Sequence, residues 1–346
     1  MTDGDAASTD VETVNIVEVT VANVAPTEAL SNDGPVNEGS PVTVSFSGQF
    51  DPSAADTAAG FHYAYHCDGS AFSPAPTYAG TAGSADSKTC TFGDNGSKTV
   101  KARIIDRNDG YTEYETTVSV DNVNPTASNP DFVFNSVLGT ATASFSFADV
   151  GWLDTHQSSF FTWSAGVAGT KTVTEENISP DATGTASESR TFAPGCYSLT
   201  VTGTAKDDDG GMSAPLSIFS GSTTGVYANG FRPPIQDNER NIAKYGNVVP
   251  VKVVLTNPCT GASVTNVSLF ITTVQGAGTE IIEDTNVVAE SVSAADSGAQ
   301  MRVADSMYIY NLTTKTMTAG KDYTVRVRLG SATGPIILAA VLQPKK

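Results

Sequence analysis

The sequence has little charge and few of the residues that favour helices. Only 16% of its 346 residues are charged, and Leu, Lys, Glu and Arg are scarce beside Val, Thr, Ser, Gly and Ala. A disordered chain would carry more charge and fewer Val and aromatic residues, whereas Val and Thr suit the pleated surface of a sheet. The composition therefore predicts an all-β protein, long enough for two or three domains.

The sequence also lacks a long apolar run. A membrane-spanning helix needs about 20 consecutive apolar residues, and a signal peptide needs a basic stretch followed by an apolar one. Neither pattern occurs, so we expect no membrane insertion. Because the composition is typical of secreted proteins but no export signal is present, we expect the sequence to be a fragment of a longer protein.

Histidine and cysteine are rare, and the common catalytic motifs are missing. The chain contains 3 His and 4 Cys, with no C-x-x-C pair, no G-x-S-x-G elbow, no H-E-x-x-H and no P-loop. These absences argue against a zinc site, a thiol redox motif and an enzyme. His156 lies near Asp154, but a Ser–His–Asp triad is defined by geometry, not by the residues available. We expect His156 to bond a loop carbonyl.

The four cysteines stand apart in a Thr- and Ser-rich chain, which indicates disulfides and an extracellular location. Cys67 and Cys90 lie in one of the sequence repeats described below, and we expect them to pair. Closing a loop of that size adds roughly 3 kcal/mol of stability in the chain-entropy model. Cys196 and Cys259 fall in different segments, so they either bridge two domains or stay free.

The formal net charge is −18, and the acidity lies in the first two thirds of the chain. Such a charge repels nucleic acid and anionic membranes, so we expect no nucleic-acid partner. The excess of acidic residues either keeps a secreted protein soluble or supplies oxygen ligands to a hard cation.

The sequence repeats with a period of about 100 residues, the length of an immunoglobulin-like sandwich domain. Asn23-Val-Ala-Pro-Thr27 recurs as Asn122-Val-Asn-Pro-Thr126. Each copy follows an alternating strand, such as residues 116–120, and its proline ends that strand. The pattern predicts tandem immunoglobulin-like β-sandwich domains.

We divide the chain into segments on this pattern. A polar linker at 221–225 ends the repeats, and different strand-like runs follow it, the last being Ile336 to Leu342 just before Pro344. The expected segments are 1–22, the last strand of a truncated upstream repeat; 23–121 and 122–220, two β-sandwiches; and 226–346, a C-terminal β-sandwich module.

Acidic residues occupy corresponding places in the two repeats. Loops that are distant in sequence gather at one end of a sandwich, and Ca²⁺ takes roughly six to eight oxygen ligands. We therefore consider a calcium site in each repeat, against the alternative that these residues only cap turns by accepting backbone N–H bonds. The candidate ligands are Asp51, Asp56, Asp106 and Asp109 in the first repeat, and Asp149, Asp154, Asp207 and Asp209 in the second.

Aromatic residues offer a second kind of site. Residues 61–65 and 160–163 are predicted aromatic strands, and Trp163 is expected in the core because the third strand of such a sandwich commonly carries a buried tryptophan. Trp152 lies in a loop. It either packs into the core or stays exposed, where it could bind a sugar ring.

The repeats 23–121 and 122–220 resemble the PKD (polycystic kidney disease) family of immunoglobulin-like domains. The resemblance rests on the Asn-Val-x-Pro-Thr starts, the Asp-x-Gly-x-x-Asp-Thr-His run at 149–156, the strand entry from Phe192 to Tyr197 and the Asp-Asp-Asp-Gly-Gly turn at 207–211. The family's aromatic-x-x-Gly-Asp-Gly turn is altered here. Residues 65–69 keep the Asp-Gly, whereas residues 163–166 have lost the Asp.

The final segment resembles a C-terminal module of large bacterial surface proteins, through Gly230-Phe231, the run from Val249 to Lys252 and the run from Tyr310 to Lys315. Together the two resemblances imply spacer or adhesive modules that are mostly extracellular and have no catalysis of their own. Some PKD domains bind calcium, so the resemblance permits the calcium sites considered above.

We therefore expect a non-catalytic, extracellular spacer or structural module of a larger bacterial surface or secreted protein, with Ca²⁺ as the one cofactor considered. One alternative is a binding module that adheres to a polysaccharide or a cell-surface protein. Another is the accessory region of a secreted hydrolase. Aromatic residues exposed together on one face would favour glycan binding, and buried ones would favour the spacer.

Overall fold

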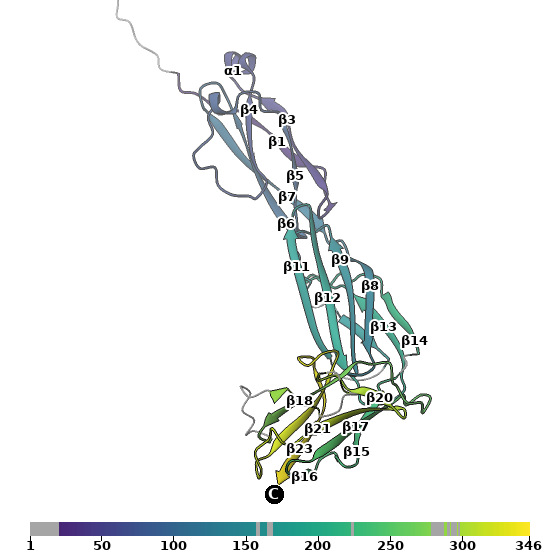
Figure 1. Cartoon of the computed structure of the whole chain (residues 1–346). Coiled ribbons are helices and arrows are strands. Elements are labelled where there is room, and N and C mark those ends of the chain that lie inside the picture. The colour runs from purple at the N-terminus through teal and green to yellow at the C-terminus, as the bar shows by residue number, and fades with distance from the viewer. Residues whose placement is uncertain are drawn as a thin grey trace, which may run out of the picture. The chain divides into compact units, whose positions relative to one another are not determined.

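The computed structural model describes residues 21–156, 160–164, 169–222, 225–277, 287–288, 291, 296 and 298–346 (Figure 1). These residues form an all-β protein of immunoglobulin-like sandwiches, as predicted. The chain divides after Val123 into two compact units. The strand predicted for a truncated upstream repeat falls almost entirely on residues 1–20, which lie outside the described residues.

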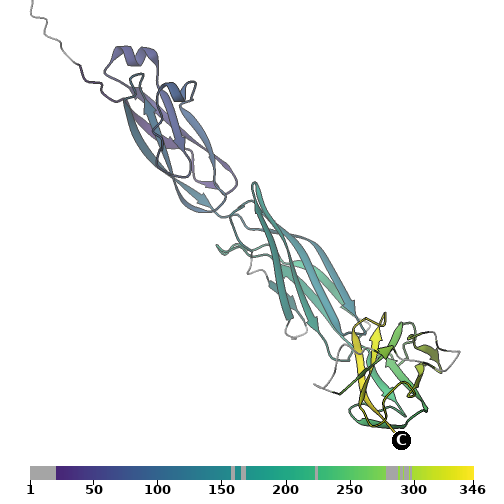
Figure 2. The ribbon, with the colours of Figure 1, turned by 60° about the vertical axis from the view of Figure 1, so that its left-hand side comes forward.

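The first unit is a sandwich of two sheets, β1-β3-β5 and β2-β7-β6-β4 (Figure 1 and Figure 2). Its core follows the alternation of the strands, as Val42, Val44 and Phe46 point inward from β3. The strands are β1 (Thr27–Asn32), β2 (Val36–Asn37), β3 (Pro41–Phe50), β4 (His62–His66), β5 (Ser87–Thr91), β6 (Gly96–Ile105) and β7 (Tyr111–Asp121).

A short helix, α1 (Ala54–Ala59), follows β3 and was not predicted from the sequence. Ser53 caps it, because its side chain accepts the backbone N–H of Asp56 at 3.3 Å. Its 6 residues make fewer than two turns, which is too short to produce a helical period in the sequence. The helix holds the Asp56 side chain in a buried position.

The second unit begins with another sandwich, made of sheets β11-β12-β9-β8 and β10-β13-β14. Its core includes Phe145, Phe147, Phe161 and Leu199, together with Trp163, which was expected there. The strands are β8 (Thr126–Asn135), β9 (Thr140–Asp149), β10 (Phe160–Trp163), β11 (Gly169–Ile178), β12 (Asp181–Thr191), β13 (Ser198–Thr204) and β14 (Leu216–Ser222).

Residues 225–346 complete the second unit as a C-terminal module with two sheets, β15-β17-β21-β20 and β16-β23-β22-β18-β19. One apolar core contains residues from both sheets, including Val251, Tyr310, Val325 and Leu342. The strands are β15 (Ala228–Arg232), β16 (Arg240–Lys244), β17 (Val248–Thr256), β18 (Leu269–Gln275), β19 (Val287–Val288), β20 (Arg302–Ala304), β21 (Met307–Thr313), β22 (Tyr323–Leu329) and β23 (Ile336–Lys345).

The last strand is longer than the sequence indicated. The prediction ended it at Leu342, just before Pro344. Instead β23 continues to Lys345, pairs in parallel with β16, and the Pro344 carbonyl accepts the N–H of Gly320 at 2.7 Å. Proline is tolerated because its carbonyl still finds a donor.

Both pairs of cysteines form disulfides. Cys67–Cys90 confirms the predicted pair and joins the end of β4 to β5, so it links the two sheets of the first sandwich. Cys196–Cys259 settles the alternative left open by the sequence, because it connects the second sandwich to the C-terminal module. Beside this bond, Gly195 and Val226 exchange two backbone hydrogen bonds, at 2.8 and 3.1 Å.

Across the described part of the chain, no helix has the length and apolar character needed to cross a bilayer.

Candidate functional site

Three aspartates of the first sandwich come together at one end of it. Asp51 follows β3, Asp56 lies in α1 and Asp106 follows β6. One oxygen from each carboxylate lies within 4.8 Å of the other two, and all three side chains are buried. The sequence predicted this juxtaposition from the loop positions alone. We call these three residues the first acidic cluster.

Two members of the first acidic cluster, Asp51 and Asp106, also accept hydrogen bonds from nearby residues. Oδ1 of Asp51 accepts the N–H of Ser53 at 2.7 Å, and Oδ1 of Asp106 accepts the N–H of Gly110 at 2.9 Å. Oδ2 of Asp106 accepts the side-chain amide of Asn23 at 2.8 Å. Turn capping and a cation site are thus compatible at Asp51, whose Oδ1 caps the turn while its Oδ2 takes no part in it.

The charge of the first acidic cluster is only partly balanced. The Arg107 guanidinium lies 2.9 Å from Oδ1 of Asp56. Asp51 is only 5% exposed, and its buried Oδ2 has no hydrogen-bond partner among the described residues. A buried carboxylate oxygen without a donor is costly, and an oxygen-loving cation such as Ca²⁺ would satisfy it.

The second sandwich has a matching group of three buried residues. Asp149 ends β9, Asp154 lies in the following loop, and Asp207 lies in the late acidic turn. One oxygen of each again lies within 4.8 Å of the others. Oδ1 of Asp149 accepts the N–H of Gly151 at 3.1 Å, and Oδ1 of Asp207 accepts that of Gly211 at 2.6 Å. We call these three residues the second acidic cluster.

His156 distinguishes the second acidic cluster from the first. The buried ring lies with Nε2 3.1 Å from Oδ2 of Asp149 and Nδ1 2.5 Å from Oε1 of Glu175, and it stacks on Phe147. The expectation that His156 bonds a loop carbonyl is therefore wrong, because both nitrogens face carboxylates. Burial lowers the pKa of His156, but the hydrogen bonds to Asp149 and Glu175 outweigh it and raise this pKa above its ordinary value.

Two predicted ligands lie differently. Oδ1 of Asp109 accepts the backbone N–H of Tyr78 at 2.8 Å, and Asp109 does not belong to the first acidic cluster. Asp209 is exposed and groups with Asp154 and Asp208, not with the fully buried set. A turn can present only some of its side chains to one point, because successive residues of a turn point in different directions.

Sequence reasoning missed several residues at these clusters. Asn23 is the first residue of the repeated Asn-Val-x-Pro-Thr motif, and the recurrence of that motif was a signal for it. Arg107 is adjacent to Asp106, but nothing in the sequence indicates its ion pair with Asp56. Glu175 lies on β11, a strand the sequence did not single out, so its approach to His156 could not be predicted.

The tryptophans occupy contrasting places. Trp163 is 8% exposed, and its Nε1 donates to Oε2 of Glu188 at 3.2 Å. Trp152 is half-buried, between the buried Gly151 and the 60% exposed Leu153. Trp152 is thus neither fully in the core nor a free aromatic platform.

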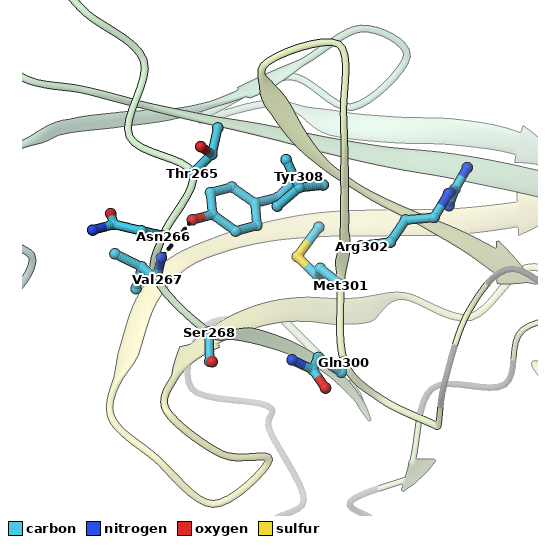
Figure 3. A pocket seen from close by; sticks show the side chains of 9 residues that line it. Thr265, Asn266, Val267, Ser268, Gln300, Met301, Arg302 and Tyr308 are labelled. Atoms are coloured by element: carbon cyan, nitrogen blue, oxygen red, sulfur yellow. Dashed lines mark hydrogen bonds between the residues drawn. The ribbon is translucent and has the colours of Figure 1, made fainter.

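The C-terminal module has an open pocket of about 440 Å³ around Tyr308 (Figure 3). The Tyr308 hydroxyl accepts the N–H of Val267 at 3.0 Å, and its ring is buried. Arg302 is held by Asp296 at 2.6 Å, and its side chain extends away from the Tyr308 ring in Figure 3. The pocket therefore offers no exposed aromatic face to a sugar.

No family model matches the chain, and no curated protein matches it significantly. Among solved structures, the chain is similar to SGBP-B of the Bacteroides ovatus mixed-linkage glucan utilization locus in complex with a heptasaccharide (12% identity, 94% of this chain, 71% of that chain, TM-score 0.22). It is also similar to domains 4–9 of the surface layer protein SbsC (16% identity, 92% of this chain, 48% of that chain, TM-score 0.20). A third likeness is to carbohydrate-binding modules of the β-sandwich superfamily (12% identity, 93% of this chain, 100% of that chain, TM-score 0.23). These likenesses concern the fold alone.

Proposed function

We propose that the chain is a non-catalytic, extracellular module of a larger bacterial surface or secreted protein, with PKD-like sandwiches that serve as a spacer and with Ca²⁺ held at the first acidic cluster. Two disulfides, the all-β fold and the acidic composition support this setting. The similar solved structures include surface-layer and carbohydrate-binding proteins, with which this chain has the β fold in common.

The histidines support the non-catalytic proposal. His156 has both ring nitrogens bonded to carboxylates and is buried, so it has no nitrogen left to activate a nucleophile. Ser70 Oγ lies 2.8 Å from Nδ1 of His66, on a tight turn. Within the described chain, no hydrogen bond joins a carboxylate to the other nitrogen of His66, as a triad would require.

The calcium proposal rests on one observation, the buried and unpartnered Oδ2 of Asp51 inside a group of three carboxylates. Asp51, Asp56 and Asp106 would each supply an oxygen, and water or backbone carbonyls would complete the shell. The second acidic cluster is a weaker candidate, since the His156 ring already lies against Asp149.

Isothermal titration of Ca²⁺ into the purified chain, with thermal unfolding in calcium and in chelator, tests this proposal. We expect the first sandwich to gain roughly 2.7 kcal/mol of stability at one hundred times the dissociation constant. Asp51→Asn should abolish the gain. Asp109→Asn is the matched control, because Asp109 lies in the same repeat but outside the first acidic cluster, and it should leave the gain intact. Identical unfolding of the wild-type chain in calcium and in chelator would overturn the proposal.

The spacer role is tested by binding to a glycan array and to insoluble polysaccharides, with calcium and with chelator. We expect no saturable binding through the two sandwiches. Saturable binding that is lost on Trp152→Ala would replace the spacer with an adhesion module that uses the Trp152 loop.

A further inference from the structure

The outer face of one sheet of the C-terminal module carries a groove. It has a volume of about 530 Å³ and lies over β16, β23 and β22; β16 and β23 are labelled in Figure 1. Small side chains form its floor, among them Thr324, Ala339 and Val341, and Arg240, Glu239 and Asn238 lie along its rim. This volume is in the range of small-molecule sites.

Arg326 lies on β22 of this sheet and is buried. Among the described residues, its side chain has no hydrogen-bond or ion-pair partner. It is 7% exposed, and no hydrogen bond or ion pair within the described chain includes its guanidinium. Its neighbours are engaged: Arg240 pairs with Asp322 at 2.7 Å, and Arg328 donates to Thr272 at 3.0 Å and to Gly334 at 2.8 Å. The N–H donors of Arg326 are therefore available to a ligand that reaches this face of the sheet.

The strand register places Arg326 beside the groove. Arg326 is opposite Ala339, and Thr324, two residues earlier on β22, is opposite Val341. Side chains at i and i+2 of a strand, and those of paired residues, lie on the same face of a sheet. Arg326 therefore shares its face with three residues of the groove floor, and Arg240 is opposite Val341 on the far side.

The chemistry of the groove fits a sugar that carries an anionic group. A guanidinium binds carboxylate or sulfate oxygens through paired N–H bonds. The Glu239 carboxylate and the Asn238 amide at the rim suit hydroxyl groups, which both donate and accept. A simple inorganic anion would gain nothing from the small apolar floor, whereas a sugar ring would pack on it.

We propose that this groove binds an acidic saccharide, with the anionic group on Arg326 and the ring over Ala339 and Val341. The site is separate from the acidic clusters and does not depend on calcium.

The test is isothermal titration of the whole chain, in chelator, with trigalacturonate, a sulfated disaccharide and the neutral maltotriose. Binding of either acidic sugar with no measurable binding of maltotriose is expected, and the stronger of the two distinguishes carboxylate from sulfate. Arg326→Gln should weaken binding by about tenfold or more. Arg302→Gln removes the same charge from the module but lies at another pocket, and it should bind as the wild type does.

Ala339→Phe is a second variant, because Ala339 is exposed on the groove floor and its replacement fills the groove without disturbing the core. It should abolish binding while the chain unfolds at an unchanged temperature. The proposal is overturned if neither acidic sugar binds, if maltotriose binds equally well, or if a folded Arg326→Gln or Ala339→Phe chain retains full affinity.

Discussion

Nε2 of His156 lies 3.1 Å from Oδ2 of Asp149 in the interior of the second sandwich, and the other ring nitrogen faces Glu175. An imidazole satisfies two acceptors only when both nitrogens carry a proton. The ring is then a cation that balances two carboxylates. The first sandwich has no histidine at the corresponding place and uses Arg107 on Asp56 instead.

His156→Gln is expected to destabilise the second sandwich by about 3 kcal/mol, because it leaves buried carboxylates without their cation. Urea unfolding followed by tryptophan fluorescence measures this selectively, since Trp152 and Trp163 are the only tryptophans and both lie in that sandwich. His66→Gln, in the first sandwich, is the control and should not move the transition. An unchanged midpoint in His156→Gln would contradict the charged ring.

The contact between His156 and Asp149 also predicts that the stability of the second sandwich depends on pH. The pKa of His156 is raised in the folded state, so its stabilisation is fully present below the ordinary histidine range, around 6.5, and is lost as the pH rises through the folded pKa. The stability difference between wild type and His156→Gln should therefore shrink from pH 6 to pH 9. A constant difference over that interval would show that the ring is neutral.

Glu28, in β1, predicts a pH dependence for the first sandwich. Both carboxylate oxygens are buried without a partner among the described residues, and burial, then the charge of Asp86, raises the pKa of Glu28 to about 8. Its contribution to stability is full below about pH 4.5 and is lost as the pH rises to 8. Glu28→Gln should flatten this slope and stabilise the sandwich at pH 8 by about 1 kcal/mol, discounted for partial exposure. Thermal unfolding by near-ultraviolet dichroism measures it, with the exposed Glu115→Gln as control.

The Cys67–Cys90 bond closes a loop with a sequence separation of 23. Replacing both cysteines by serine should lower the free energy of unfolding of the first sandwich by about 3 kcal/mol, mainly because the unfolded chain gains conformational entropy when the loop is opened. Calorimetry of the variant and the oxidised wild type measures the change. The Cys196→Ser, Cys259→Ser double variant should leave the first sandwich's transition in place, and a shift of that transition would contradict the division into two units.

Gly203 in β13 is predicted to be intolerant of any side chain. A Cβ atom there would lie 2.5 Å from Cδ1 of Phe145, which is fixed in the core. Gly203→Ala should lower stability by about 2 kcal/mol. Gly221→Ala, in the neighbouring β14, is the matched control, since its Cβ would meet nothing closer than 3.4 Å. Equal unfolding temperatures for the two variants would show that the Phe145 ring moves aside.

Local sequence patterns predicted much of the fold. The alternating run at 116–120 predicted part of β7, and the matching aspartates predicted that Asp51, Asp56 and Asp106 would meet. The β11–β12 hairpin was missed because most of its side chains are exposed Thr, Glu and Ser, which give no apolar period. Partners set by tertiary packing, such as Glu175 on His156, have no signal in the sequence, because strand order is decided by long-range pairing.

The linker predicted at 221–225 lies within the loop that Cys196–Cys259 closes. A pulling force applied to the two ends of the chain would therefore pass through the sulfur–sulfur bond and bypass that linker. With a sequence separation of 63, roughly 210 Å of extensible chain would stay slack under load. Reduction of one covalent bond would release this length, so the compliance of the C-terminal part of the molecule would depend on the surrounding redox conditions.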